Sequence, residues 1–105
     1  MDDVFKALAD PSRRVLLDAL FHENGQTVTD LCDTLEMTRF GVMKHLRVLE
    51  SARLVVSRKR GRERRHYLNV VPIQEIYDRW VRKFQRVPAR ALVELKRALE
   101  ERYAE

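Results

Sequence analysis

The feature that most constrains the fold is the order of the elements expected between residues 29 and 68. Two short helical patterns are joined by a tight turn, and two strand-like runs follow on either side of a glycine. Helical spacing of apolar residues predicts the helices, and the short runs around Gly61 predict a β-hairpin. The sequence therefore predicts a mainly α-helical fold with a small β-hairpin, in which a helix-turn-helix precedes the hairpin.

Basic residues are concentrated in this same part of the chain. Residues 38–70 contain ten Lys and Arg but only two acidic residues, so their net charge is +8, whereas the remainder sums to −3. Such a concentration is the electrostatic footprint of a surface that binds a polyanion, because each neutralised phosphate releases condensed counterions. A solvated basic surface is the alternative, and the helix-turn-helix context favours DNA binding by a winged helix-turn-helix.

Two further helices are predicted before the helix-turn-helix. The first covers about residues 3–9, and Pro11 ends it because proline disfavours helix at the preceding residue. The second runs from about Pro11 to Asn24, where Asn24-Gly25 terminates it. Its predicted inner side chains are Val15, Leu16, Ala19 and Leu20.

The helix-turn-helix is predicted to begin at Thr29, as the N-cap of a helix with Leu31, Cys32 and Leu35 on its inner side. Glu36-Met37 forms the turn, and Thr38 caps the next helix. Inside that helix Val42, Leu46 and Leu49 recur at spacings of four and three, so they are expected to point inward. Gly41 is a poor residue for a helix interior and indicates close packing against the preceding helix or close approach to DNA.

The outer side of this helix suits the major groove of DNA, where Arg and Lys meet guanine edges or flanking phosphates. A solvated amphipathic helix is the alternative for this helix taken alone. The residues expected to contact DNA from this recognition helix are Thr38, Arg39, Phe40, Met43, Lys44, His45 and Arg47.

The predicted hairpin comprises residues 54–60 and 63–70, with Gly61-Arg62 as its two-residue turn. Its strands offer apolar side chains at Val56 and Tyr67, with Leu54 and Leu68 as further candidates, and its distal end is crowded with basic residues. A basic ribbon buries little surface by itself, so its simplest use is to lie along the sugar-phosphate backbone or in the minor groove. The residues expected to contact DNA from this wing are Arg58, Lys59, Arg60, Arg62, Arg64 and Arg65.

An apolar stripe at helical spacing runs from Pro72 to Tyr103 and is longer than the core of one small domain requires. Pro88 is expected to break or kink this helix because proline lacks an N–H and clashes with the carbonyl four residues earlier. We expect part of the stripe to face a second subunit, with an effector pocket as the alternative. The stripe comprises Ile73, Ile76, Tyr77, Trp80, Phe84, Val87, Ala91, Leu92, Leu95, Leu99 and Tyr103.

Four runs of sequence together resemble the ArsR/SmtB family of winged-helix transcriptional repressors, from residue 4 to about residue 80. They are FKALADPSRR (residues 5–14), VTDLC (28–32), VMKHLRVLE (42–50) and the hairpin from LVVSR to RHYL (54–68). The resemblance implies a homodimer that binds a palindromic operator in double-stranded DNA and represses transcription. Met43 stands where the family commonly has Ser, so an apolar contact to a thymine methyl is the expected replacement.

The resemblance also implies that the terminal helices, about residues 3–9 and 72–103, form a dimer interface within a single domain over residues 1–105. The residues expected in that interface are Phe5, Leu8, Trp80, Phe84, Leu92, Leu95 and Leu99.

Many members of the family sense metals, and the resemblance places their Cys-x-Cys pair at Thr27 and Thr29 of this chain. The three histidines all precede residue 70, whereas the family's other metal site uses histidine on the last helix. A zinc or arsenite site needs three or four converging ligands. We therefore expect no metal and no cofactor, and we expect Cys32 to be a small, half-buried apolar residue.

An enzymatic function finds little support in the sequence. The sequence has no glycine-rich phosphate loop and no HExxH pattern, so we expect no enzymatic activity. A single cysteine, an acidic start and the lack of any apolar run near the roughly 18 residues of a membrane span predict a cytoplasmic protein.

A structured-RNA-binding or ribosome-associated role stays open, because Arg and Lys aimed at phosphates do not separate RNA from DNA. A protein-interaction module that uses the C-terminal stripe stays open too, and the sequence identifies no effector.

Overall fold

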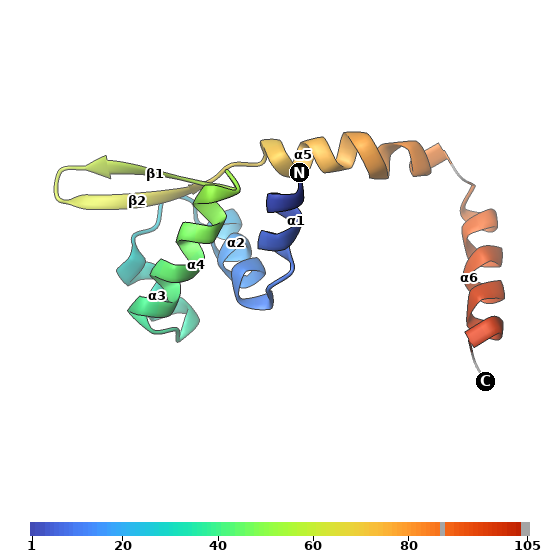
Figure 1. The fold of residues 1–105 in the computed structure, drawn as a ribbon, viewed down its shortest axis with the longest axis horizontal. Coiled ribbons are helices and arrows are strands. Elements are labelled where there is room, and N and C mark those ends of the chain that lie inside the picture. Colours follow the sequence, from blue (N-terminus) through green and yellow to red (C-terminus); the bar gives the residue numbers. More distant parts are fainter. Residues whose placement is uncertain (87, 104–105) are drawn as a thin grey trace. The chain divides into compact units, whose positions relative to one another are not determined.

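The structure is a computed structural model that describes residues 1–86 and 88–103. Its contacts group the chain into two compact units, Met1–Ile73 and Gln74–Glu105, where the sequence interpretation treats residues 1–105 as one domain. Helices α1 to α4 and the hairpin belong to the first unit, as Figure 1 shows. No helix among the described residues is long and apolar enough to cross a membrane.

The elements follow the predicted order. They are α1 (Asp2–Leu8), α2 (Pro11–His22), α3 (Val28–Leu35), α4 (Arg39–Ser51), β1 (Val55–Arg60), β2 (Glu63–Leu68), α5 (Val71–Ile76), a π-helical turn η1 (Tyr77–Val81), a 3₁₀ segment η2 (Arg82–Arg86) and α6 (Ala89–Tyr103).

Helix α2 begins with a well-formed N-cap. Asp10 Oδ1 accepts hydrogen bonds from the backbone N–H of Ser12 at 2.8 Å and of Arg13 at 3.3 Å, and Pro11 occupies the first helical position. Desolvation raises the pKa of Asp10, but those two hydrogen bonds and the charges of Arg13 and His45 outweigh it and hold the pKa below its ordinary value.

The predicted inner face of α2 is partly wrong. Leu16 and Leu20 are fully buried as expected, but Leu17 is also buried and Val15 is 43% exposed. The reason is that α2 contacts α1, α3, α4 and β2, so neighbours cover it on more than one side. The prediction assumed one buried face, so it did not include the second side of α2 that neighbouring elements cover.

Helix α3 begins two residues earlier than predicted, and its N-cap is Thr27 rather than Thr29. The Thr27 hydroxyl accepts from the Asp30 N–H at 3.1 Å, and the Asp30 carboxylate accepts from the Thr27 N–H at 3.1 Å. This is a capping box, with Asp in place of the usual Glu or Gln. Backbone and hydroxyl hydrogen bonds from Thr27 hold the pKa of Asp30 below its ordinary value.

Helix α4 matches its prediction closely. Thr38 caps it by accepting from the Gly41 N–H at 3.1 Å, and Val42, Leu46 and Leu49 are buried. With Leu16, Leu20, Leu31, Leu54 and Val55 these side chains form the centre of the core. The inner side of α4 therefore packs in the core, and its other sides are accessible to solvent.

The C-terminus of α4 leads directly into the hairpin. The Arg53 N–H donates to the Glu50 carbonyl and the Leu54 N–H donates to the Leu49 carbonyl, both at 2.9 Å, which is the Schellman pattern. Arg53 has a φ of 62° at the position that usually holds glycine. Buried Leu54 and Leu49 supply the apolar contact that accompanies this motif, so β1 starts from a fixed point.

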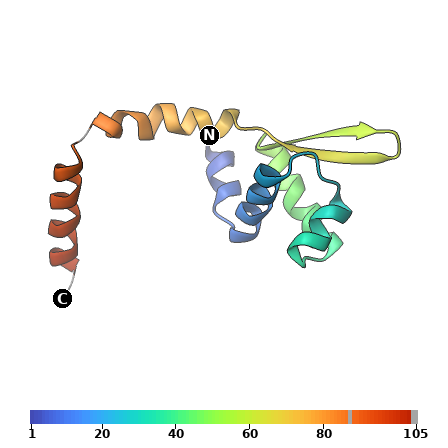
Figure 2. The ribbon, with the colours of Figure 1, turned by 180° about the vertical axis from the view of Figure 1, so that it is seen from behind.

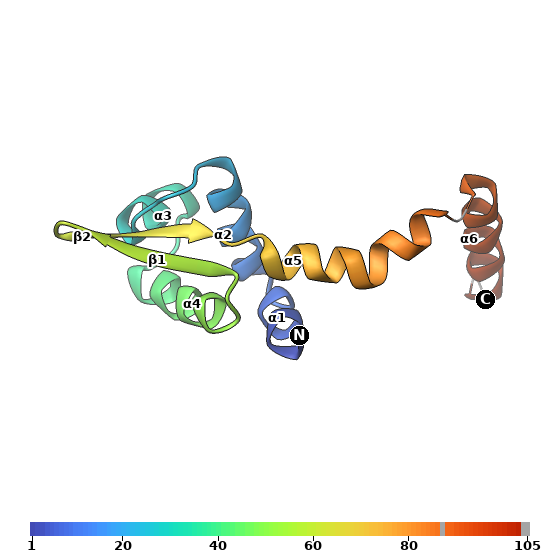
Figure 3. The ribbon, with the colours of Figure 1, turned by 90° about the horizontal axis from the view of Figure 1, so that it is seen from above.

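The hairpin is shorter than predicted at its base. Strands β1 and β2 pair antiparallel from Val55 opposite Leu68 to Arg60 opposite Glu63. The predicted turn at Gly61-Arg62 is confirmed, and Gly61 has a φ of 62°, as a tight hairpin turn requires. The turn lies at the end of the hairpin that extends past the helices of the first unit (Figures 1 and 3).

The C-terminal helical region is interrupted, as Pro88 predicted. The helical segments before it end at Arg86, and α6 starts at Ala89, with the Pro88 carbonyl accepting from the Ala91 N–H at 2.9 Å. Val87 of the predicted stripe lies outside the described residues. None of the described side chains of α6 is buried.

Candidate nucleic-acid interface

Helix α4 exposes most of the residues predicted for the recognition helix. Because Val42, Leu46 and Leu49 turn inward, Phe40 is 77% exposed and Met43 is 38% exposed. Basic side chains share this outer surface. Its exposed members are Thr38, Arg39, Phe40, Met43, Lys44 and Arg47.

His45 differs from the other residues predicted to contact DNA from this helix. Its side chain is half-buried, and in the described part of the chain its Nδ1 is buried with no hydrogen-bond partner. His45 contributes to the lowered pKa of Asp10, so it lies near the N-cap of α2. The structure thus places this residue toward the inside of the first unit.

The surroundings of Gly41 differ from those that the sequence interpretation expected. A Cβ built at this position would lie 3.0 Å from the Thr38 hydroxyl oxygen, which is the oxygen that caps the helix. The expected close packing against the preceding helix is therefore not the cause. The Thr38 cap does not require glycine either, because α3 forms the same cap with Asp30, which carries a Cβ, three residues after Thr27.

A hydrogen bond links the recognition helix to α3. Arg39 Nη1 donates to the hydroxyl oxygen of Thr29 at 3.2 Å. Between the two helices, Glu36 adopts a left-handed backbone with a φ of 53°. The turn of the helix-turn-helix is thus formed by the residues predicted for it, and Arg39 spans it.

The wing carries its basic residues in opposed pairs. Arg58 lies directly opposite Arg65, and Lys59 lies directly opposite Arg64. Like charges at directly opposed positions of an antiparallel pair are destabilising. Glu63, opposite Arg60, is the acidic residue of the paired segment and accepts from Arg65 Nη2 at 2.9 Å.

The six wing residues predicted to contact DNA are not equally available. Arg58, Lys59, Arg60, Arg62 and Arg64 are exposed, whereas Arg65 is half-buried. Arg65 Nη1 also donates to the carbonyl of Gly25 at 3.1 Å. Arg65 therefore helps to fix the wing to the α2–α3 loop.

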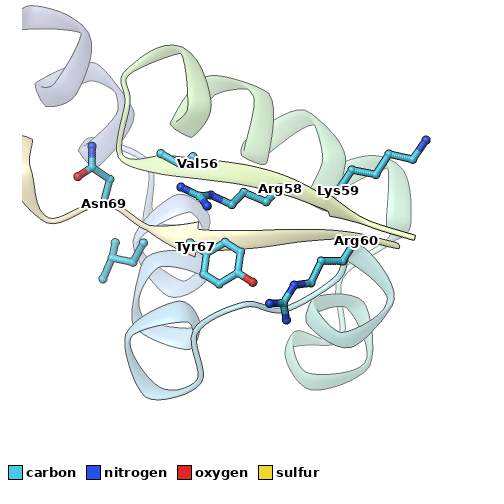
Figure 4. Close-up of a pocket in the computed structure, with 7 residues that line it drawn as sticks. Val56, Arg58, Lys59, Arg60, Tyr67 and Asn69 are labelled. Carbon is cyan, nitrogen blue, oxygen red and sulfur yellow. The ribbon is translucent and has the colours of Figure 1, made fainter. Parts of the chain in front are cut away.

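One face of the hairpin is hollowed into a shallow cavity of about 580 Å³. Arg58, Lys59 and Arg60 of β1 and Tyr67 of β2 are among the residues that line this cavity, and Figure 4 labels them. Val56 is exposed because its side chain lies on this outer face.

The opposite face of the hairpin looks toward α4 and α3, which lie on one side of it in Figures 1 and 2. A groove of about 400 Å³ lies between β2 and α4. Three guanidinium groups line it, together with one carboxylate and one imidazole. The lining residues are Val28, Arg39, Met43, Leu46, Arg47, Glu50, Arg64 and His66.

The base of the wing is anchored by residues that sequence reasoning missed. The α2–α3 loop pairs with the free edge of β2: the Gly25 N–H donates to the His66 carbonyl at 2.9 Å, and Asn24 Oδ1 accepts from the Leu68 N–H at 2.8 Å. Among the described residues, Gln26 and His66 are buried polar side chains at this junction. The signal for His66 was its place in the strand: side chains alternate between the two faces of β2, so the sequence could have placed this polar residue on the inner face.

Thr27 and Thr29, at which the resemblance places the family's paired thiolates, carry hydroxyls with structural roles. Thr27 caps α3 and Thr29 accepts from Arg39. Cys32 is half-buried. Within residues 1–86 and 88–103, no three His, Cys, Asp or Glu side chains are grouped so that they could hold a metal ion.

Comparisons with known proteins identify the domain. Residues 8–58 match a family model described as a helix-turn-helix domain. The chain is 37% identical over 86 residues to the HTH-type transcriptional regulator YuzN of Bacillus subtilis, covering 76% of this chain and 94% of YuzN. It is 29% identical to the transcriptional repressor SdpR of the same organism, covering 80% of this chain and 91% of SdpR.

Solved structures agree with this assignment. An ArsR family transcriptional regulator superposes with a TM-score of 0.67 at 31% identity, covering 80% of this chain and 84% of that one. An ArsR-like regulator from Rhodococcus sp. RHA1 superposes with a TM-score of 0.69 at 28% identity, covering 97% and 91%. With α4 and the wing arranged as described, the chain belongs to the ArsR/SmtB family of winged helix-turn-helix transcriptional regulators, a DNA-binding and non-enzymatic family.

Proposed function

We propose that this regulator is a homodimeric repressor that binds a palindromic operator in double-stranded DNA. The observation that carries the proposal is the strand register of the wing, which places Arg58 opposite Arg65 and Lys59 opposite Arg64. Such pairs cost stability in the free protein. Phosphates placed beside them neutralise the repulsion and release counterions, so the wing suits a nucleic-acid backbone.

In this proposal α4 reads the bases while the wing follows the backbone. Arg39 and Lys44 are exposed on α4 and reach guanine edges or phosphates, and Phe40 and Met43 supply apolar contacts to thymine methyl groups. Repression is supported by SdpR, which is a transcriptional repressor. An operator site overlapping a promoter would explain repression by simple exclusion of the transcription machinery.

Apolar side chains on both terminal regions support dimerisation. Phe5 on α1 is 44% exposed, and in the second unit Phe84 and Leu95 are 58% and 56% exposed. Exposed apolar patches of this kind mark protein interfaces. The other proposed interface residues are Leu8, Trp80, Leu92 and Leu99. A two-fold dimer would require half-sites about one helical turn apart, or a multiple of it.

The test is a competition experiment with the full chain. Labelled duplex DNA from the gene's own promoter region, chosen for any inverted repeat found there, is bound first and then challenged with unlabelled random-sequence duplex DNA or structured RNA at fixed salt. The proposal expects random-sequence duplex and structured RNA each to displace only a small share of the labelled promoter duplex. Preferential displacement by structured RNA would replace the proposal with the RNA-binding alternative.

Sedimentation tests the dimer separately. The full chain is expected to sediment as a dimer at micromolar concentration, and Leu95→Glu is expected to shift it toward monomer because a carboxylate would be buried in the interface. Arg97→Glu on the same helix is the matched control and should leave the dimer intact. A wild-type chain that sediments as a stable monomer would exclude dimerisation.

A further inference from the structure

His66 is an unusual residue for the wing because its side chain is only 5% exposed. It shares the inner face of the hairpin with Ser57, its direct partner on β1. That face is directed at α4 and at the α2–α3 loop. His66 is therefore the point at which a titratable group of the wing meets the helical part of the first unit.

One side of the imidazole is bound to the α2–α3 loop. The Gln26 carbonyl oxygen lies 2.8 Å from the His66 backbone nitrogen and 3.0 Å from Nδ1. Because a carbonyl oxygen carries no proton, the short contact requires the hydrogen to be on Nδ1. Gln26 is itself held by its side-chain amide, which donates to the carbonyls of Ala19 at 3.0 Å and Glu23 at 2.7 Å.

The other side of the ring faces the recognition helix. Nε2 lies 3.8 Å from the Oε1 atom of Glu50, in the last two turns of α4. A neutral ring with its hydrogen on Nδ1 presents the Nε2 lone pair to a carboxylate, which gives no hydrogen bond. A protonated ring presents an N–H and a positive charge, which gives a charge-assisted contact.

Further charged groups surround the ring in the groove between β2 and α4. Arg39 and Arg47 of α4 and Arg64 of β2 line this groove together with His66 and Glu50. The loop and β1 supply uncharged Gln26 and Ser57. Helix α3 contributes the apolar side chain of Val28 to this groove. The Asp30 carboxylate of the same helix accepts from the Thr27 N–H within the capping box. When phosphates neutralise the three arginines, protonation of the ring becomes more favourable.

We propose that Glu50 and His66 are positioning residues that form a proton-dependent latch between the recognition helix and the wing, closing as DNA binds. The proposal rests on the proposed function, since the latch matters only if both elements engage one duplex. Closing it adds a side-chain contact between α4 and β2 to the backbone hydrogen bonds that already anchor the base of the wing. DNA binding should then take up a proton at His66, and affinity should fall as pH rises.

The first test measures the affinity of the full chain for a short random-sequence duplex from pH about 5.5 to 8 at fixed salt. The wild type is expected to lose about fivefold more affinity over this range than Glu50→Gln. The side-chain amide introduced by Glu50→Gln donates to the neutral Nε2, so that variant keeps the latch closed at every pH. His22→Gln on exposed α2 is the matched control and should keep the wild-type profile.

Parallel wild-type and Glu50→Gln profiles would overturn the latch, as would an equal flattening by His22→Gln. Thermal unfolding at each pH confirms that the variants remain folded. If the chain binds no duplex at all, the proposed function fails, but the latch is still tested in the free protein. There, nitrogen NMR at pH about 8 should find the hydrogen of His66 on Nδ1. A hydrogen on Nε2 would overturn the proposal whatever the DNA result.

Discussion

Arg13 on α2 donates a hydrogen bond from Nε to the carbonyl oxygen of Ala7 on α1 over 2.8 Å. Its Nη2 donates to the carbonyl of Lys6 at 2.9 Å, and Arg14 donates to that of Leu8 at 2.7 Å. The last carbonyls of a helix have no partner inside it. The two arginines therefore complete the C-terminus of α1 and hold this short helix on α2.

We expect Arg13→Ala to lower the free energy of unfolding by about 2 kcal/mol, because two carbonyl groups lose charged donors. Urea denaturation of the full chain measures the change. Arg97→Ala on α6 removes an exposed arginine and serves as the control. A loss no larger than that of the control would show that water replaces the guanidinium without cost.

Arg53→Gly should have the opposite sign. Arg53 holds a left-handed backbone with a φ of 62°, where a side chain is strained and glycine is not. The substitution is expected to raise the free energy of unfolding by about 1 kcal/mol. Arg53→Ala keeps the strain and should give no gain, so an equal effect of both variants would contradict the explanation.

Arg60→Ala and Arg62→Ala test the wing as a backbone contact. Each is expected to weaken binding to specific and random duplexes about equally and to reduce the slope of log affinity against log salt by about one unit per lost phosphate contact. Affinity titrations at several salt concentrations give the slope, with Arg97→Ala as the control. Unchanged affinity and slope in both variants would show that the wing does not contact DNA.

Arg39→Ala should alter sequence preference rather than general affinity. If the guanidinium binds a guanine through two hydrogen bonds, its loss costs about 1 to 3 kcal/mol on a duplex selected by the wild type and much less on random duplex. Thr29→Ala removes the present partner of Arg39 but keeps the guanidinium, so it should retain the preference. Equal losses on both duplexes would make Arg39 a phosphate contact.

Asp30→Asn tests the capping box through pH. The hydrogen bonds from Thr27 lower the pKa of Asp30, so the charged carboxylate stabilises the fold above the ordinary pKa of 3.8. This contribution is lost as pH falls through the folded-state pKa. The stability gap between wild type and Asp30→Asn should therefore shrink below pH 3.8, as urea denaturation at several pH values would measure. A gap that stays constant into acid would show that the charge contributes nothing.

Much of the first unit could be predicted because its signals are local. Thr38 followed by Val42, Leu46 and Leu49 marks both the start and the inner side of α4, and the structure confirms all four. Capping is less certain when two candidates are close together. Thr27 and Thr29 are both suitable residues, and the decisive sign was Asp30 three residues after Thr27.

The sequence by itself determined the helices, the hairpin turn and the basic character of α4 and the wing, because periodicity, caps and charge are properties of neighbouring residues. Only the tertiary structure decided which polar groups meet across the chain. Arg65 reaches Gly25, and His66 lies between Gln26 and Glu50, forty residues and sixteen residues away. Such contacts depend on how α2, α4 and β2 pack together, and no local pattern encodes that packing.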